Sequence, residues 1–224
     1  MRIGTIFSGK MKTFNNQFIS TKFFMFIIPL FPIESYFFIN NKNEGFEIGL
    51  HKQSVIKAYA SFFTLVLGGF ILLMHGSFYH YKLLYQYGSI IGFFLILLSL
   101  YFFFEYGKTT EEEKKERFLY EKAIKINALP EYLNENATRR VLRKLLNSLK
   151  LSMNLSEEIR DINIDEIIQK HQYSKKDLGL LFAIKGYQKR LNQSDNLNDY
   201  QIYNMIKNEF KSYLTTLKNN ISIN

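Results

Sequence analysis

Residues able to do acid–base or nucleophilic chemistry are few and scattered in this chain of 224 residues. With no cysteine, the chain lacks a thiol nucleophile, a disulfide and a cysteine-held metal. It also has no phosphate-binding glycine loop, no G-x-S-x-G motif and no HExxH motif. A site built from scattered polar residues at a membrane face would use Glu34, Ser35, His51 and Lys52. Such a site would have to form a cleft to act on a lipid or an envelope precursor.

The four histidines do not form a recognisable ligand set. His75 and His80 flank a short connection between two apolar stretches, where two imidazoles could bind a metal or haem. Their spacing of five does not place them on one helix face, and no carboxylate is near them in the sequence. His51 and His171 are isolated. We therefore expect interfacial histidines without a ligand, and no cofactor or metal.

A basic amphipathic stretch, TRRVLRKLLNSLK, spans residues 138–150. Its cations could meet anionic lipid or an acidic partner. The alternative, a packed helix with a solvated basic face, is favoured. Its basic side chains are Arg139, Arg140, Arg143, Lys144 and Lys150. A nearby acidic group is expected to be a solvated helix face, and it consists of Glu157, Glu158, Asp161, Asp165 and Glu166.

Two uncharged apolar stretches, residues 58–74 and 83–104, are each long enough to cross a bilayer as a helix. We predict two spans at about residues 57–75 and 83–104, joined as a hairpin. The second span contains Gly88 and Gly92 in a GxxxG pattern, which lets helix backbones approach closely. This pattern predicts packing either within one hairpin or between two copies. Uncharged spans argue against a transporter unless hairpins oligomerise around a path.

The charges that flank the spans predict the orientation. The loop between the spans carries Lys82, whereas the outer flanks carry several lysines and Arg117. The positive-inside bias then places both termini in the cytoplasm of a bacterium, with the chain in its inner membrane. The same bias accounts for the net charge of +9, so no nucleic-acid partner is expected and membrane lipids are.

The stretch STKFFMFIIPLFPIESYFF, residues 20–38, is apolar but is interrupted by Pro29 and Pro32. Its uncharged run is half the length of a span, so a re-entrant segment is the weaker interpretation. Aromatic and β-branched residues on both sides of the prolines predict strands instead. Residues 45–51 alternate like a third strand, and residues 2–7 offer a fourth.

The segment TKFFMFIIPLFPIESY resembles a pattern in uncharacterised bacterial two-span membrane proteins: Thr-Lys-aromatic, then Ile-Pro-Leu-x-Pro, then Ser-Tyr. It is also similar to the middle of small zinc-ribbon modules, where such a stretch lies between two cysteine pairs. Because this chain has no cysteine, the resemblance over residues 3–50 implies a ribbon that keeps its β scaffold without zinc. It implies no enzymatic activity and no site residues.

Beyond residue 107 the chain becomes charged, with apolar residues at helical spacing. Helices are predicted over residues 111–125, 135–149, 156–170, 175–191 and 199–217. The predicted fold is therefore a mixed membrane protein with three parts: a cytoplasmic β module (1–52), a transmembrane helical hairpin (53–106) and a cytoplasmic all-α domain (107–224).

This organisation favours a non-enzymatic scaffold or accessory subunit of a membrane complex. It would bind a protein partner, or a second copy, through its cytoplasmic parts. The alternatives are a membrane-associated enzyme acting on a lipid or envelope precursor, and a small channel or transporter subunit.

Overall fold

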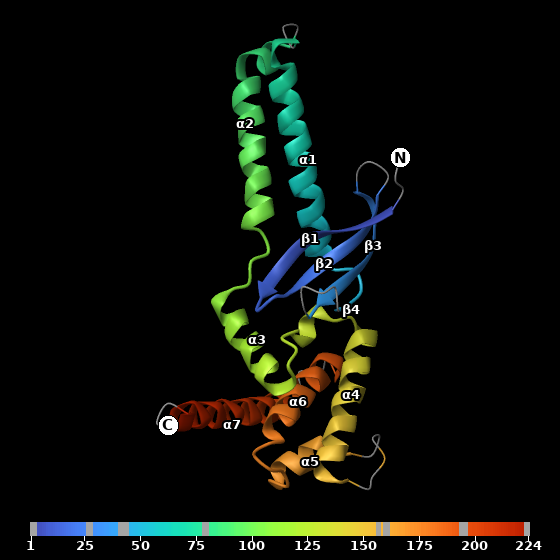
Figure 1. The fold of residues 1–224 in the computed structure, drawn as a ribbon, viewed down its shortest axis with the longest axis vertical. Helices are drawn as coiled ribbons and strands as arrows, with labels where there is room; N and C mark the ends of the chain where they lie inside the picture. Colours follow the sequence, from blue (N-terminus) through green and yellow to red (C-terminus); the bar gives the residue numbers. More distant parts are fainter. Residues whose placement is uncertain are drawn as a thin grey trace. The chain divides into compact units, whose positions relative to one another are not determined.

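The computed structural model describes residues 4–25, 29–39, 45–77, 81–155, 158, 162–192 and 197–221. The chain forms two compact units, residues 1–110 and residues 111–224. The first unit holds a sheet and two long helices, and the second holds the remaining helices (Figure 1). The expected order of a small β module followed by helices is confirmed. The sheet and the two long helices share one unit, because the sheet packs on the start of the first helix.

Four antiparallel strands form the sheet in chain order: β1 (Gly4–Phe14), β2 (Gln17–Met25), β3 (Pro29–Phe38) and β4 (Gly45–Glu47). Asn15 and Asn16, both with positive φ, connect β1 to β2, as a two-residue hairpin turn requires. β1 and β2 extend beyond the predicted strands. Pro29 and Pro32 were expected to form a break or a strand edge, and the second alternative is confirmed. Pro29 begins β3, and in the described pairing β4 covers only Tyr36–Phe38, so both prolines lie where β3 is an edge. The register shifts by one residue near both prolines, and such irregularities accommodate a residue that cannot donate to the ladder.

The two faces of the sheet differ because side chains alternate along each strand. On β2, the side chains of Ile19, Thr21 and Phe23 are fully buried. The opposite face carries an aromatic cluster in which Phe7 contacts Phe38 edge-on, with ring centroids 5.1 Å apart. The buried face meets the first long helix, as the hydrogen bond from Thr21 to Ser54 shows.

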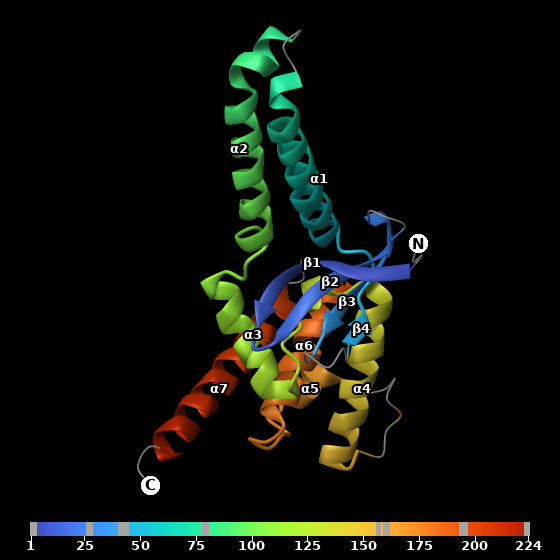
Figure 2. The same cartoon turned by 45° about the horizontal axis from the view of Figure 1, so that its top comes forward.

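Two long helices, α1 (Lys52–Met74) and α2 (Lys82–Phe104), form an antiparallel hairpin with a short 3₁₀ turn, η1 (His75–Ser77), after α1 (Figures 1 and 2). Lys52–Ser77 and Tyr85–Phe104 are long and apolar enough to cross a membrane, and each contains an 18-residue window whose mean hydropathy is 1.8 and 2.1, respectively. Between the helices, Ser99 donates a hydrogen bond to the Ser61 carbonyl at 2.7 Å. The expected pair of apolar helices is therefore present.

Strand β1 contacts the ends of both long helices. The Gly9 carbonyl accepts a hydrogen bond from the Ser54 hydroxyl, in the first turn of α1, at 2.8 Å. The Lys12 amide donates to the Gly107 carbonyl, just beyond α2, at 2.8 Å. The sheet thus holds together the two helix ends that lie opposite η1.

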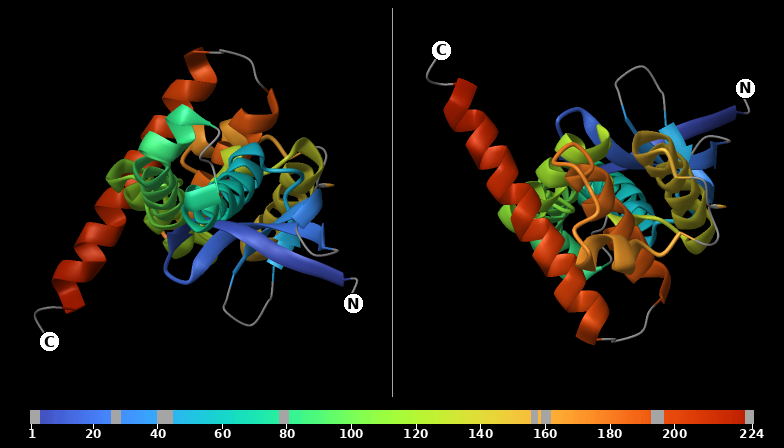
Figure 3. Two further views of the ribbon diagram at one scale, coloured as in Figure 1. Left: turned by 90° about the horizontal axis from the view of Figure 1, so that it is seen from above. Right: turned by 90° about the horizontal axis from the view of Figure 1, so that it is seen from below.

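The second unit contains α3 (Glu111–Ile124), η2 (Pro130–Tyr132), α4 (Glu135–Met153), α5 (Ile164–Gln169), α6 (Leu178–Asn192) and α7 (Leu197–Ile221). Helix α6 is its centre, because nearly every side chain from Leu178 to Tyr187 is buried. Phe182 contacts the rings of Tyr120 on α3 and Tyr203 on α7, at centroid distances of 4.8 Å and 5.7 Å. The carboxyl-terminal half of α7 extends beyond the other helices of this unit (Figure 3).

The helix predicted over residues 156–170 is shorter in the structure. Helix α5 begins at Ile164, because the Asn163 side chain caps it by accepting from the Glu166 amide. Asp165 pairs with Lys185, which is only 3% exposed in its side chain, at 2.6 Å. Asp165 was expected on a solvated acidic face, but it faces a buried cation. Residues 156, 157 and 159–161 lie outside the described part of the chain.

Candidate functional site

The residues expected for an enzymatic site at the membrane face, Glu34, Ser35, His51 and Lys52, do not converge on a cleft. Ser35 is fully buried on the sheet face that meets α1. Glu34 follows it on β3 and therefore points to the opposite face, where it accepts a hydrogen bond from the Tyr36 hydroxyl at 2.6 Å. Lys52 is exposed at the start of α1.

Three buried hydroxyls, of Ser35, Thr21 and Ser54, instead form a chain of hydrogen bonds. Thr21 donates to Ser54 at 2.9 Å, and Ser54 donates to the Gly9 carbonyl at 2.8 Å. Because each hydroxyl has one proton, Ser35 must be the donor to Thr21 across their 2.7 Å contact. Ser35 in turn accepts from the His51 backbone amide at 2.9 Å. Every proton in the chain is used, so its evident role is to join the three strands to α1.

His51 donates from its backbone amide to the Ser35 hydroxyl of this series and is the N-cap residue of α1. Its Nδ1 accepts from the Ser54 amide at 3.3 Å, which caps the helix. Burial, together with the nearby charge of Lys12, lowers the pKa of His51. The imidazole is then neutral at pH 7, which a capping acceptor requires. His51 and Ser35 thus hold the helix on the sheet, in an arrangement that leaves Ser35 no free path to a substrate.

Replacing Thr21 with valine, which has a similar shape, should destabilise the sheet of the first unit by about 1–3 kcal/mol. The change leaves the Ser35 proton without its acceptor and takes from Ser54 the hydrogen bond it accepts. Hydrogen exchange of the β2 and β3 amides in detergent micelles measures the effect. Thr13→Val, at an exposed position of β1, is the matched control and should change little. Equal protection in both variants would contradict a structural role for the hydroxyl chain.

The remaining histidines are not gathered. The His75 ring stacks on Tyr85 at a centroid distance of 6.1 Å. His80 lies outside the described residues. His171 is exposed, and its Nδ1 lies 3.1 Å from the Tyr173 hydroxyl. Among the residues that the structure describes, no three His, Asp or Glu side chains are close enough to hold a metal ion.

The basic residues predicted on one helix lie on α4. Arg139, Arg140, Arg143 and Lys144 are exposed on its outer face, whereas Lys150 is half-buried. Arg139 forms an ion pair with Glu135 one turn earlier, at 2.6 Å. Such an exposed pair contributes little to stability. The structure thus presents four of the five cations together on one surface.

The GxxxG residues of α2 face α1. A Cβ added to Gly92 would lie 2.7 Å from the Leu72 side chain and 3.0 Å from the Gly68 carbonyl oxygen. A Cβ on Gly88 would lie 2.6 Å from His75 Nδ1. Both glycines therefore permit close packing within the hairpin, which is one of the two predicted alternatives.

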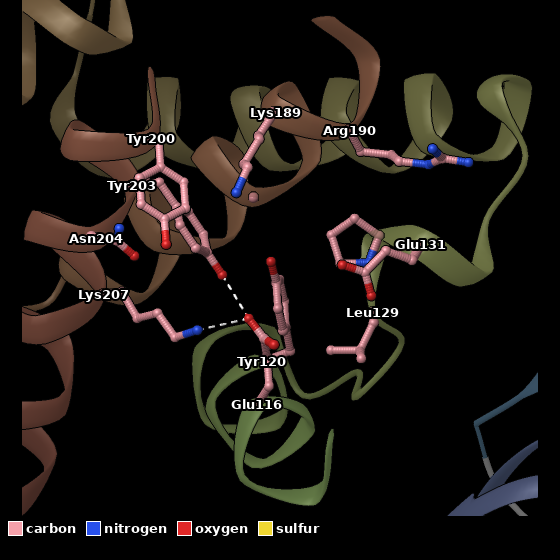
Figure 4. Close-up of a pocket in the computed structure, with 12 residues that line it drawn as sticks. Glu116, Tyr120, Leu129, Glu131, Lys189, Arg190, Tyr200, Tyr203, Asn204 and Lys207 are labelled. Carbon is pink, nitrogen blue, oxygen red and sulfur yellow. Dashed lines mark hydrogen bonds and ion pairs between the residues drawn. The ribbon is translucent and has the colours of Figure 1, made fainter. Parts of the chain in front are cut away.

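A pocket of about 410 Å³ opens in the second unit, between α3, the segment around η2, α6 and α7 (Figure 4). We call it the tyrosine pocket. Its lining residues are Glu116, Tyr120, Leu129, Pro130, Glu131, Gly186, Lys189, Arg190, Tyr200, Tyr203, Asn204 and Lys207. Tyr120, Tyr203 and Leu129 are buried, whereas Lys189, Arg190 and Tyr200 are exposed.

Glu116 is already paired inside the tyrosine pocket. It accepts hydrogen bonds from the Tyr203 hydroxyl and from Lys207 Nζ, both at 2.8 Å (Figure 4). Burial alone would raise the pKa of Glu116, but these two hydrogen bonds outweigh burial and lower it. Glu116 therefore stays ionised, and its charge is matched by Lys207.

The opposite wall carries charges that are not matched in this way. Lys189 Nζ lies over the rings of Tyr200 and Tyr203, 4.4 Å and 5.2 Å from their centroids. Among the described residues, neither Lys189 nor Arg190 forms an ion pair. Burial, and next the charge of Glu116, raise the pKa of Glu131, while the charges of Arg190 and Lys189 act in the opposite direction. The pocket thus offers two cations, of which Lys189 lies over an exposed aromatic ring.

Sequence reasoning did not find the tyrosine pocket. Its residues come from α3, the η2 segment, α6 and α7, which are separated by long stretches of chain. The local signal that could have indicated it lies on α7, where Tyr200, Tyr203 and Lys207 recur at helical spacing. Comparisons with protein-family models, curated proteins and solved structures give no match for this chain.

Proposed function

We propose that this chain is a non-enzymatic scaffold or accessory subunit of a membrane complex, whose helical unit binds an acidic segment of a protein partner at the tyrosine pocket. The observation that carries the proposal is the wall formed by Lys189 and Arg190. Lys189 lies over the exposed ring of Tyr200, Arg190 lines the same pocket, and neither has an ion pair among the described residues. An acidic side chain or a terminal carboxylate of a partner would form ion pairs with both cations.

The charge balance of the pocket favours an anion over a cation. Its lining carries three cations, Lys189, Arg190 and Lys207, and two carboxylates, Glu116 and Glu131. Lys207 is already paired with Glu116. The exposed face of Tyr200 adds apolar contact area, of the kind found where protein partners are held.

The anchor of this protein would be the α1–α2 hairpin, inserted in the inner membrane of a bacterial cell. The apolar lengths of Lys52–Ser77 and Tyr85–Phe104 support insertion. Lysines on the outer flanks outnumber Lys82 in the connection, which supports cytoplasmic termini. The proposed binding pocket would then be kept close to the membrane surface, where a membrane complex assembles.

Site-specific photo-crosslinking in native membranes tests the proposed binding. A benzoylphenylalanine placed at Tyr200 should give an adduct with a partner when irradiated. The double variant Lys189→Glu/Arg190→Glu should lower adduct yield by at least tenfold, because loss of two cation–carboxylate contacts exceeds about 1.4 kcal/mol. Mass spectrometry of the adduct should map the crosslink to an acidic segment.

The chain provides a matched control on the basic face of α4. Arg143→Glu/Lys144→Glu also reverses one arginine and one lysine at adjacent exposed positions, but outside the tyrosine pocket. This control should keep the adduct. An adduct that survives reversal of Lys189 and Arg190 would contradict the proposed site, and one that depends only on Arg143 and Lys144 would assign binding to α4.

A further inference from the structure

One end of the sheet exposes apolar side chains on three neighbouring strands. Phe31 on β3 is 66% exposed, and its register partner Phe24 on β2 is 37% exposed. Ile33, in β3, is 43% exposed. At the start of β1, Ile6 is 42% exposed. We call these four side chains the apolar end of the sheet; they cover an end rather than one face.

The apolar end lies alongside α1. Thr21 on β2 bonds to Ser54, and two residues later Phe23 contacts the ring of Tyr59 at a centroid distance of 5.5 Å. The strands cross α1 obliquely rather than running along it (Figures 1 and 2). Phe24 follows Phe23 on β2 and therefore lies near the level of Tyr59.

The last charged residues of the sheet and of α1 lie at a similar level along the axis of α1. The last charged residues before the β2–β3 connection are Lys22 and Glu34, which are register partners. The eleven residues between them, 23–33, carry no charge. On α1 the last charge is Lys57, whose Nζ bonds to the Tyr106 carbonyl at 2.8 Å. Beyond this level the described residues of both elements carry no charge, and Phe63 on α1 is 51% exposed. Arg2, which precedes β1, lies outside the described residues.

We propose that the apolar end of the sheet is inserted in the interfacial layer of the membrane leaflet that α1 enters. The inference rests on the proposed insertion of the α1–α2 hairpin. The bilayer is the favoured occupant because the apolar end is continuous with the outward surface of α1 and shares its charge boundary. A depth of about 5–10 Å suffices for such side chains. Deeper insertion is opposed, because open sheet edges are not tolerated in the hydrocarbon core.

The absence of cysteine makes the test direct, since single cysteines can be introduced without further changes. The full chain is reconstituted in vesicles with an environment-sensitive NBD label at Phe31→Cys, at Leu67→Cys or at Thr13→Cys. Leu67 is exposed in the middle of α1, and Thr13 is exposed at the opposite end of the sheet. Lipids brominated near the headgroup or deep in the acyl chains then act as quenchers.

The label at Phe31 should be quenched most strongly by the shallow bromines, and an Ile33→Cys label should behave alike. The label at Leu67 should be quenched by the deep bromines, and the label at Thr13 by neither. A Phe31 label that is not quenched while the Leu67 label is quenched would overturn the inference but keep the hairpin in the membrane. If the Leu67 label is not quenched either, the proposed hairpin insertion itself fails. A Phe31 label shielded from water but quenched by no lipid would overturn the inference in favour of a protein contact.

Discussion

Replacing Gly9 with alanine should destabilise the first unit by at least about 3 kcal/mol, through a clash and backbone strain together. Gly9 has a φ of +70°, and a Cβ placed there would lie 2.1 Å from the Ser54 carbonyl oxygen. Neither the Gly9 backbone nor the Ser54 carbonyl can move aside at low cost, because both segments are held in backbone hydrogen bonds. The Gly9 carbonyl also ends the hydroxyl chain by accepting from Ser54. The variant would therefore separate β1 from the first turn of α1.

Hydrogen exchange of the full chain in detergent micelles measures this loss. If opening governs exchange, 3 kcal/mol corresponds to about a hundredfold faster exchange of the β1 and β2 amides, at about 1.4 kcal/mol per tenfold change. Gly4→Ala is the matched control, because a Cβ on Gly4 meets nothing within 4 Å. Similar protection in the Gly9 and Gly4 variants would show that the sheet does not depend on this close approach to α1.

The sequence pattern could predict the elements that carry a strong periodic or compositional signal. The uncharged runs at 58–74 and 83–104 correspond to α1 and α2, and the apolar spacing of residues 135–149 corresponds to α4. In these segments the spacing and length of the apolar runs are visible in the sequence itself, and they indicate the helix directly. The prolines of β3 were predicted at a break or a strand edge, and they lie at an edge. The register irregularities beside them could not be predicted, because they depend on the partner strand.

The tertiary contacts that bind elements together could not be predicted in the same way. Gly9 lies within a strand, and the residues next to it in the sequence do not indicate that Ser54, 45 residues away, contacts it. Similarly, Lys189 and Glu116 reach the tyrosine pocket from different helices. The packing of α3, α6 and α7 brings such residues together, so composition and spacing could not predict their contacts.

Two of the cations in the net charge are buried rather than solvated. Arg117 was counted among the flanking charges that orient the spans, yet its side chain is fully buried in the helical unit. Lys185 is also buried and lies between Asp165 and Asp199, at 2.6 Å and 2.9 Å. Such cations are structural, because each is matched by fixed acceptors. The predicted orientation then rests on the remaining flanking lysines and stays a prediction.

Replacing Arg117 with lysine should destabilise the helical unit by about 3 kcal/mol, although the charge is kept. Arg117 Nε donates to the Asn127 backbone carbonyl at 3.0 Å and to the Asn127 side-chain oxygen at 3.1 Å, and its terminal nitrogen donates to that side-chain oxygen as well. The guanidinium also lies over the Tyr132 ring, 5.7 Å from its centroid. An ammonium has no planar fork to satisfy both oxygens from one position.

Burial lowers the pKa of Arg117, yet an arginine in a protein keeps its proton. Burial would also lower the pKa of a lysine at this site, which starts from a lower ordinary value. Urea unfolding of the full chain in micelles, followed by hydrogen exchange of the α3 and α6 amides, measures the cost. Lys115→Arg is the control, since Lys115 is exposed on the same helix and its replacement should change stability by less than about 0.5 kcal/mol. Were Arg117→Lys no more costly than Lys115→Arg, the guanidinium would be serving only as a buried charge. A loss of about 3 kcal/mol would instead assign it the task of fixing the segment after α3, from which Leu129, Pro130 and Glu131 line the tyrosine pocket.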